Sequence, residues 1–247
     1  MRFSNWLGAP LLALALLASA ASAEIVDENS PSWAFFEEIP AGLGSFGPGP
    51  DTPPMGNGSA AFAIDGTGRL ILGTNRFAGT RLDQLTTLTY WTYRSSGSSS
   101  VAISLQLNVD YDLTDGDGSW QGRLVFEPSN TPTAILDNTW QEWDSLAGSW
   151  WSSGAPGNGT CPISSPCTTA EVLSAFPDAG IQAGPILGVL LLKAGGPWAP
   201  AFFGAADGLT VGVDGTDTVF DFEEDAVRIF VDGFESGTTL AWSDTVL

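Results

Sequence analysis

The sequence predicts an all-β fold: an antiparallel β-sandwich with a jelly-roll-like topology and one short helix. Three observations predict it. Strand-like segments recur along the chain, clusters of Gly, Pro, Asn and Asp separate them, and helical patterns are scarce. The 30 glycines and 16 prolines among 247 residues favour many turns over long helices. Short strands broken at such intervals are typical of two packed antiparallel sheets.

The clearest strand lies at 101–110, where residue character alternates strictly. The apolar residues Val101, Ile103, Leu105, Leu107 and Val109 alternate with Ala102, Ser104, Gln106, Asn108 and Asp110. We expect one face of this strand in the core and the other in solvent. The segment 85–93 is rich in Thr, Tyr and Trp, which suit strands. The Ser/Gly-rich stretch 95–100 predicts a hairpin between the two.

Further strands and a single helix complete the expected architecture. The strands are expected at 69–72, 122–127, 186–192, 209–213 and 218–222. The helix should begin at Thr168, which forms a capping box with Glu171, and end before Pro177. A parallel sheet would need many such helices. Their scarcity favours antiparallel pairing.

The first 23 residues have the pattern of a secretory signal peptide. Arg2 precedes an apolar run at 10–18, and small residues, Ala21 and Ala23, occupy positions −3 and −1 before Glu24. The run is too short for a lasting membrane span. We expect a signal peptide at 1–23, a β-sandwich domain at 24–223 and a C-terminal tail at 224–247. The mature protein should be secreted or on the cell surface, without a membrane span.

The chain is strongly acidic, with 28 Asp and Glu against 8 Lys and Arg and a net charge of −20. Such a surface repels nucleic-acid phosphates and anionic lipid headgroups. The charge therefore predicts no nucleic-acid partner and no membrane-surface partner, and among glycans it favours neutral ones. The same acidity can equally serve solubility alone.

The two cysteines, Cys161 and Cys167, enclose a short loop. In an exported chain a close pair predicts a disulfide bond that holds a surface excursion. Redox activity is disfavoured because the spacing is wider than Cys-x-x-Cys. A zinc site is disfavoured because two thiols lack the further ligands that zinc requires.

The absence of histidine limits the chemistry that this chain can perform. Ser-His-Asp and Cys-His catalysis and His-bearing metal centres are excluded. Glycoside hydrolysis needs only two carboxylates and remains open. Glu142 and Asp144 would share a strand face, yet the Glu-x-Asp-x-Glu motif of jelly-roll glucanases is missing. An enzyme is therefore the weaker reading.

Tryptophan is abundant, and indole faces are good platforms for sugar rings. The densest cluster is Trp140, Trp143, Trp150 and Trp151, while Trp120 and Trp198 lie elsewhere. Because side chains alternate along a strand, about half of the cluster should be core. The predicted ligand-binding residues are Trp143, Trp151 and Trp198, with Trp151 the best exposed candidate.

A second group of polar residues lies directly after the alternating strand. Its carboxylates are Asp110, Asp112, Asp115 and Asp117, interspersed with Gly116 and Gly118. Dense carboxylates with glycine suit calcium. The spacing departs from that of an EF-hand loop, and an ordinary Asp-Gly turn is the alternative. Calcium is thus a possible cofactor and no other is expected.

Several short segments resemble those of secreted bacterial β-sandwich proteins with galactose-binding-domain-like jelly rolls, a group that includes many carbohydrate-binding modules. These are Gly-Asn-Gly-Ser at 56–59, 122–128, Trp-Gln-Glu-Trp-Asp at 140–144 and Asp-Phe-Glu at 221–223. The likeness covers about residues 31–223 and implies the fold, but no sugar-binding residue transfers by position. By analogy with such jelly rolls, a structural calcium would pair Glu37 or Glu38 with Asp207.

The tail also resembles a known type. Its Asp-Gly-Phe-Glu stretch at 232–235 is similar to the end of many secreted proteins of some Gram-negative bacteria. The resemblance implies a sorting or processing segment in a Gram-negative protein. One more edge strand is the alternative reading.

These observations leave three functional hypotheses. The first is a secreted non-catalytic protein that binds a neutral carbohydrate. The second is a structural surface or matrix protein without a small ligand. The third, weaker one is a carboxylate-dependent glycoside hydrolase or lyase. Exposed tryptophans on one face would favour the first, and paired carboxylates in an aromatic cleft would favour the third.

Overall fold

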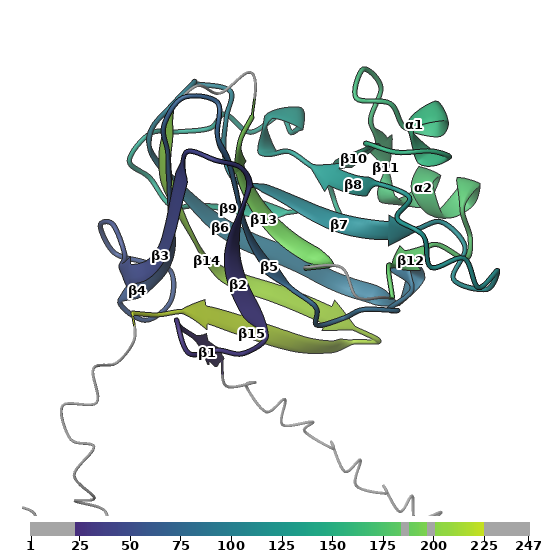
Figure 1. Cartoon of the computed structure of the whole chain (residues 1–247), viewed down its shortest axis with the longest axis horizontal. Coiled ribbons are helices and arrows are strands. Elements are labelled where there is room, and N and C mark those ends of the chain that lie inside the picture. The colour runs from purple at the N-terminus through teal and green to yellow at the C-terminus, as the bar shows by residue number, and fades with distance from the viewer. Residues whose placement is uncertain (1–22, 184–187, 197–200, 225–247) are drawn as a thin grey trace, which may run out of the picture.

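Two sheets packed face to face form the body of the protein (Figure 1). The computed structural model describes residues 23–183, 188–196 and 201–224. The predicted signal peptide, except Ala23, and the tail beyond Glu224 lie outside the described residues. Among the described strands, every pair is antiparallel except β1 with β15. The predicted antiparallel β-sandwich is confirmed.

In the described residues the first sheet has seven strands in the order β1-β15-β14-β4-β3, with β6 pairing both β14 and β9. Their bounds are β1 (Glu24–Val26), β3 (Gly42–Pro48), β4 (Gly58–Ile64), β6 (Leu85–Ser96), β9 (Gln141–Asp144), β14 (Phe202–Val213) and β15 (Thr216–Phe222). The first strand of the described chain therefore lies beside the last one.

The second sheet, as far as the structure describes it, has eight strands in the order β11-β10-β8-β7-β13-β5-β2, with β12 pairing β7. Their bounds are β2 (Trp33–Ile39), β5 (Arg69–Thr74), β7 (Ser104–Asp110), β8 (Arg123–Phe126), β10 (Ser149–Ser152), β11 (Cys167–Thr168), β12 (Gly180–Ile181) and β13 (Leu190–Gly195). The outer face of this sheet carries the candidate site.

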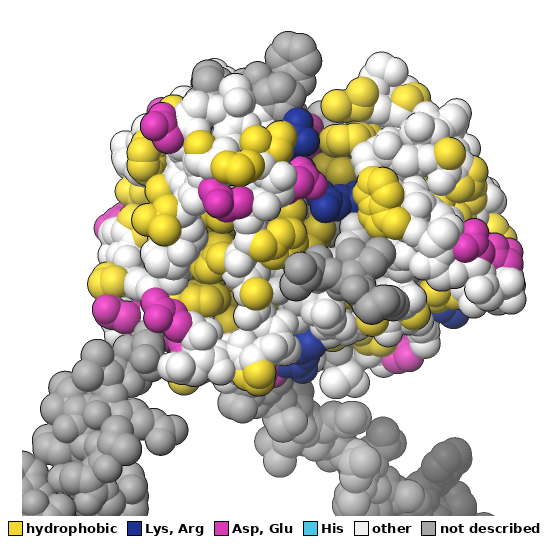
Figure 2. All heavy atoms as spheres, in the orientation of Figure 1, with side chains coloured by type: hydrophobic (Ala, Val, Ile, Leu, Met, Phe, Trp, Pro, Cys, Tyr) yellow, Lys and Arg dark blue, Asp and Glu magenta, His cyan; other side chains and the backbone are white. Residues whose placement is uncertain are grey.

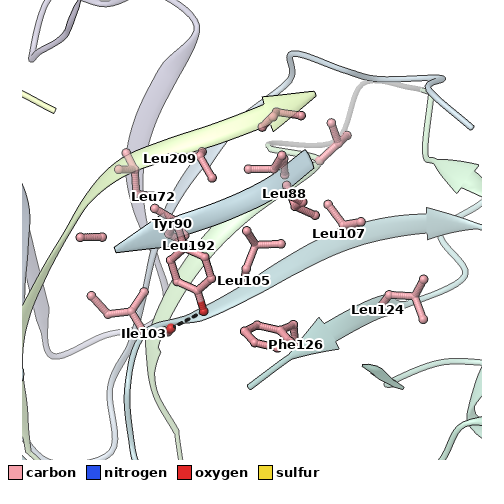
Figure 3. Packing of buried hydrophobic residues seen from close by; sticks show 14 of the residues in the cluster. Leu72, Leu88, Tyr90, Ile103, Leu105, Leu107, Leu124, Phe126, Leu192 and Leu209 are labelled. Carbon is pink, nitrogen blue, oxygen red and sulfur yellow. Dashed lines mark hydrogen bonds between the residues drawn. The ribbon is translucent and has the colours of Figure 1, made fainter. Parts of the chain in front are cut away.

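The core lies between the sheets and consists of aliphatic and aromatic side chains. In Figure 3, Leu88 and Tyr90 of β6 face Leu105 of β7 and Phe126 of β8. The Tyr90 hydroxyl donates to the carbonyl of Ile103 at 2.9 Å, which satisfies its buried polar atom. The inward-facing residues of 101–110 are thus core residues, as the alternation predicts.

Helical structure is short, as expected. Two α-helices, α1 (Gly157–Thr160) and α2 (Thr169–Ala175), and two 3₁₀ turns, η1 (Leu82–Gln84) and η2 (Pro128–Asn130), are present in the described residues. The predicted capping box is confirmed: the Thr168 hydroxyl accepts from the Glu171 amide, and the Glu171 carboxylate accepts from the Thr168 amide. None of the described helices is long and apolar enough to cross a membrane.

Two expectations about the strand at 101–110 are wrong. The segments 85–93 and 101–110 do not form a hairpin, because β6 belongs to the first sheet and β7 to the second. The chain at 97–103 crosses between the layers. The outer face of β7 is also not open to solvent, since Ser104, Gln106 and Asn108 are at most 7% exposed. Long side chains from neighbouring strands cover them, as described below.

The remaining strand predictions hold with shifted bounds. The segments 69–72, 122–127 and 218–222 lie within or overlap β5, β8 and β15, and 209–213 is the second half of the longer β14. The strand expected at 186–192 starts at Leu190 and continues to Gly195. The predicted disulfide is confirmed, because Cys161 and Cys167 are joined beside α1.

Candidate functional site

A pocket of about 590 Å³ hollows the outer face of the second sheet. Strands β2, β5, β7, β8, β10 and β13 contribute to its lining, together with the loops around Val101, Trp120 and Ile163. Figure 2 shows this hollow near the middle of the face, where Lys or Arg and Asp or Glu side chains meet hydrophobic ones. The pocket therefore combines charged and apolar surface.

The strand register brings the polar floor of the pocket together. Gln106 on β7 lies opposite Val125 on β8, and Asn108 lies opposite Arg123. On the other side of β7, Ser104 lies opposite Lys193 of β13. Residues two apart on a strand share a face, so these side chains all project outward. The polar residues of the alternating segment 101–110 thus form part of the floor of the pocket.

Hydrogen bonds fix this floor. The Arg123 Nε donates to Asn108 Oδ1 at 3.1 Å, and its Nη1 donates to Gln106 Oε1 at 3.3 Å. Gln106 Nε2 in turn donates to Ser104 Oγ at 3.0 Å. Buried side chains that are bonded in series have little freedom to reorient. The floor is therefore a rigid, pre-arranged polar surface.

One carboxylate, that of Glu38 on β2, is surrounded by three cations. It pairs with Arg123 at 2.7 Å, Lys193 at 2.5 Å and Arg69 at 3.4 Å. Burial alone would raise the pKa of Glu38, but the hydrogen bonds and charges of Lys193 and Arg123 outweigh it and lower the pKa to about 2. Glu38 is therefore ionised at any physiological pH.

Two indoles border the charged floor. Trp120 is 57% exposed, and its Nε1 donates to Asn108 Oδ1 at 3.3 Å, which ties the ring to the floor. Trp151 of β10 is half-buried in the pocket lining. Its Nε1 is buried and has no hydrogen-bond partner in the described chain. The exposed Trp120 ring is available to a ligand, whereas the Trp151 donor is closed off from solvent.

Glu127 is the second carboxylate of the pocket lining. Burial raises its pKa, and the neighbouring Trp151 indole and Lys193 charge only partly offset that effect. The Trp151 N–H lies near enough to influence Glu127 without meeting it in hydrogen-bond geometry, so we count this donor as unpaired. The two pocket carboxylates, Glu38 and Glu127, thus have pKa values displaced in opposite directions.

The three predicted ligand-binding tryptophans have different positions. Trp151 lines the pocket. Trp143 is wrong as a ligand residue: it is 3% exposed, packs in the core and donates from Nε1 to Thr92 Oγ1 at 2.8 Å. It points inward because its register on β9 places it opposite Tyr90 of β6. Trp198 lies outside the described residues.

Sequence reasoning missed most of the pocket. No site role was predicted for Arg69, Arg123 or Lys193. Trp120 was noted in the sequence but was not assigned a role. Two signals could have found them. Basic residues are rare in this chain, so each one is informative, and the polar half of an alternating strand can be the floor of a concave site. The meeting of six strands in space has no local signature.

The predicted calcium loop forms a series of turns. Asp110, Asp112, Asp115 and Asp117 each accept from the backbone N–H two residues ahead. Such side-chain turns are the usual use of Asp in loops. Within the described residues, no group of three or more His, Cys, Asp or Glu is arranged to hold a metal ion.

The pairing of Glu37 or Glu38 with Asp207, implied by the resemblance, is not found. Glu37 accepts from the amides of Ala41 and Gly42 in the β2–β3 turn, and Glu38 belongs to the pocket. Asp207 of β14 accepts from the amides of Met55 and Phe222. The two glutamates are on the second sheet and Asp207 is on the first, which accounts for the separation.

Asp207 has other acidic neighbours, Asp221 and Glu223, at the end of β15. Burial, then the charge of Asp221, raise the pKa of Asp207 to about 7 against the effect of its backbone hydrogen bonds. Burial and the adjacent Glu223 raise the pKa of Asp221 to about 6. The Oδ1 atom of Asp221 is buried without a hydrogen-bond partner. We call this group, Asp207, Asp221 and Glu223, the seam cluster.

Comparison with known proteins gives a likeness in structure but none in sequence. No protein-family model matches the chain, and no curated protein matches it in sequence. Among solved structures it is similar to the family 11 carbohydrate-binding module of the cellulosomal cellulase Lic26A-Cel5E of Clostridium thermocellum. The TM-score is 0.41 at 12% identity, and the alignment covers 79% of this chain and 97% of that chain.

Proposed function

We propose that this protein is exported and binds a carbohydrate in the pocket of the second sheet, without turning it over. One observation carries the proposal: two indoles, Trp120 and Trp151, border a rigid floor of hydrogen-bonding side chains. Sugar rings offer an apolar C–H face and many hydroxyls, and this combination complements an indole beside fixed donors and acceptors. The pocket volume of about 590 Å³ lies within the range typical of small-molecule sites.

The net charge bears on which carbohydrate is bound. At −20 the protein as a whole repels polyanions. A glycan chain that is neutral over most of its length avoids this repulsion. The ligand is therefore a largely neutral glycan, and the protein does not bind nucleic acid.

The state of Glu38 argues against turnover. Hydrolysis of a glycosidic bond needs one carboxylate as nucleophile or base and another as acid. Glu38 is held by three cations and, with a pKa of about 2, is a weak base. A glycoside hydrolase or lyase is nevertheless the second candidate, because the pKa of Glu127 is raised as a general acid requires. A structural protein without a small ligand is the third.

Titration of soluble glycans tests the proposal. We expect binding in the micromolar to millimolar range, roughly −8 to −4 kcal/mol, since few rings stack at once. Trp120→Ala should weaken it by about tenfold with little effect on unfolding, because the ring is largely exposed. Trp151→Ala should abolish binding at some cost in stability, because this ring is half-buried.

The matched control is Trp140→Ala. Trp140 is also a partly buried tryptophan, but it packs on Tyr93 and donates to Pro50 O, away from the pocket. Its replacement should leave affinity unchanged. No binding by any glycan of a broad panel would contradict the proposal and favour the structural protein. Release of reducing sugar or of an unsaturated product would favour the enzyme.

A further inference from the structure

The pocket has a local charge opposite to that of the protein as a whole. The structure describes six Lys and Arg residues, and three of them, Arg69, Arg123 and Lys193, line this one pocket. Only two carboxylates, Glu38 and Glu127, lie in the same lining. Even with both ionised, the lining has an excess of positive charge on a chain whose net charge is −20.

The three cations have donors left over after their contacts with the protein. Within the described residues, Lys193 Nζ donates only to Glu38, and Arg69 only through Nη1. Arg123 uses Nε and Nη1 for Asn108, Glu38 and Gln106, and Nη2 has no acceptor in the part of the chain that the structure describes. One carboxylate, Glu38, is thus the principal anion for three cationic groups. A carboxylate brought by a ligand could accept hydrogen bonds from several donors beside Glu38 that the described residues do not use.

A neighbouring hollow, which shares Trp120 with the pocket, has the opposite charge. Its lining includes Asp112, Asp115, Asp117 and Asp178 and no Lys or Arg. Trp120 belongs to the lining of both hollows. An anionic ligand stacked on this ring would be attracted to one side and repelled from the other. The two hollows therefore define a single orientation for such a ligand.

We propose that the pocket recognises a carboxylate-bearing sugar residue, a uronic acid, within a largely neutral glycan. Arg69, Arg123 and Lys193 bind its carboxylate next to Glu38, while Trp120 and Trp151 contact the ring. An isolated uronate avoids the long-range repulsion that a polyuronate would meet from a net charge of −20. The inference rests on the proposed function and specifies the ligand of the same site.

A matched ligand pair tests the inference without altering the protein. The first ligand is an oligosaccharide with one glucuronic acid residue, and the second is the same oligosaccharide with that carboxyl reduced to the alcohol. We expect the acidic ligand to bind roughly tenfold more tightly, as one charge-assisted hydrogen bond can provide. The preference should decrease as NaCl is raised, because added salt screens charges. A polygalacturonate should bind less well than the singly charged ligand.

Variants locate the effect. Lys193→Gln and Arg69→Gln should each reduce the ratio of acidic to reduced-ligand affinity, with Lys193 giving the larger change because it is less exposed. The control Arg81→Gln removes the same charge from a cation paired with Asp83 and Asp178 outside the pocket, and should leave the ratio unchanged. Should Lys193→Gln fail to fold, Arg69→Gln and the ligand pair still decide the matter.

The outcomes separate the two proposals. Equal affinity for the acidic ligand and its reduced form would overturn the uronate inference and leave carbohydrate binding intact. If Arg81→Gln lowers the ratio of acidic to reduced-ligand affinity as much as Lys193→Gln does, the preference is a long-range effect of net charge. This result would also overturn the uronate inference. Binding of neither ligand, nor of any glycan in the panel, would overturn both.

Discussion

Glu38 in the pocket and two carboxylates of the seam cluster, Asp207 and Asp221, are all withdrawn from solvent to some degree, yet their pKa values are displaced in opposite directions. In the pocket, Glu38 lies among three cations and its pKa falls to about 2. In the seam cluster, Asp207 and Asp221 lie beside Glu223, and their pKa values rise to about 7 and about 6. Burial raises the pKa in both places. At Glu38 the hydrogen bonds and charges of the cations outweigh burial, whereas at Asp207 and Asp221 burial is the largest cause and a neighbouring carboxylate adds to it.

The difference assigns different roles to the two regions. Glu38 is a permanent anion that positions the cations of a binding floor. The seam cluster collects negative charge where β14, β15 and the loop at 55–57 meet, with no Lys or Arg paired to it among the described residues. The first arrangement is stable when charged, and the second is stable when protonated.

The largest expected effect is on the pH dependence of stability. Folding raises the pKa of Asp207 and Asp221 above the unfolded value of about 4. Their contribution to the free energy of unfolding is therefore complete below pH 4 and is lost as pH rises toward 7. For the fully buried Asp207 the loss is on the order of 4 kcal/mol. Glu38 acts oppositely and loses its contribution as pH falls from about 4 toward 2. Denaturant unfolding in chelator should show a maximum of stability near pH 4 to 5.

Asp221→Asn should make the free energy of unfolding decline less steeply between pH 4 and 7. Asp221 is preferred over Asp207 because both Asp207 oxygens accept backbone N–H groups, so that an amide there would place a donor against a donor. The matched control is Glu142→Gln on the exposed part of β9, which should leave the slope unchanged. A stability that rises steadily from pH 4 to 8 in the native protein would contradict the role of the seam cluster.

The next effect is a difference in sign between two charge-removing substitutions at neutral pH. Glu38→Gln leaves three cations around a neutral amide and should lower the free energy of unfolding by about 1 to 2 kcal/mol, a value reduced for solvent screening. Asp221→Asn removes a repelled charge and should raise it. Chemical unfolding at pH 7.5 measures both. A change of the same sign in the two variants would show that burial, and not neighbouring charge, governs these sites.

Much of the fold was predictable from the sequence, because alternation, turn residues and a capping box are local signals. The strand at 101–110 and the helix after Thr168 show this. The site was less predictable. The prediction of a hairpin at 95–100 was wrong because a turn-rich linker has the same composition whether it joins two strands of one sheet or crosses between two sheets. The error over Trp143 arose because strand register decides which indole faces inward, and register depends on partners distant in the chain.

A smaller effect is expected from calcium at the predicted 110–117 loop, because no group of three or more carboxylates among the described residues is arranged to hold a metal ion. Binding to the folded state should raise the melting temperature by a few degrees through mass action. We expect Asp112→Asn, which removes one of the loop carboxylates, to remove the rise, and Asp221→Asn, which lies outside the loop, to retain it. Thermal unfolding in millimolar calcium and in chelator measures this. A rise that persists in Asp112→Asn would contradict the loop as its source, and identical curves would remove calcium altogether.

The smallest expected effect concerns the segment that follows the seam cluster. β15 ends at Phe222 and Glu223 donates its amide to Val26 of β1, so the pairing of the first and last described strands is complete by that point. A chain that ends at Glu224 keeps all three carboxylates of the cluster. It should therefore unfold within about 1 kcal/mol of the full chain, as surface changes do, with the same dependence on pH. A larger loss of stability would make the segment 227–234 an integral strand, whereas an unchanged core with altered export would support the sorting role.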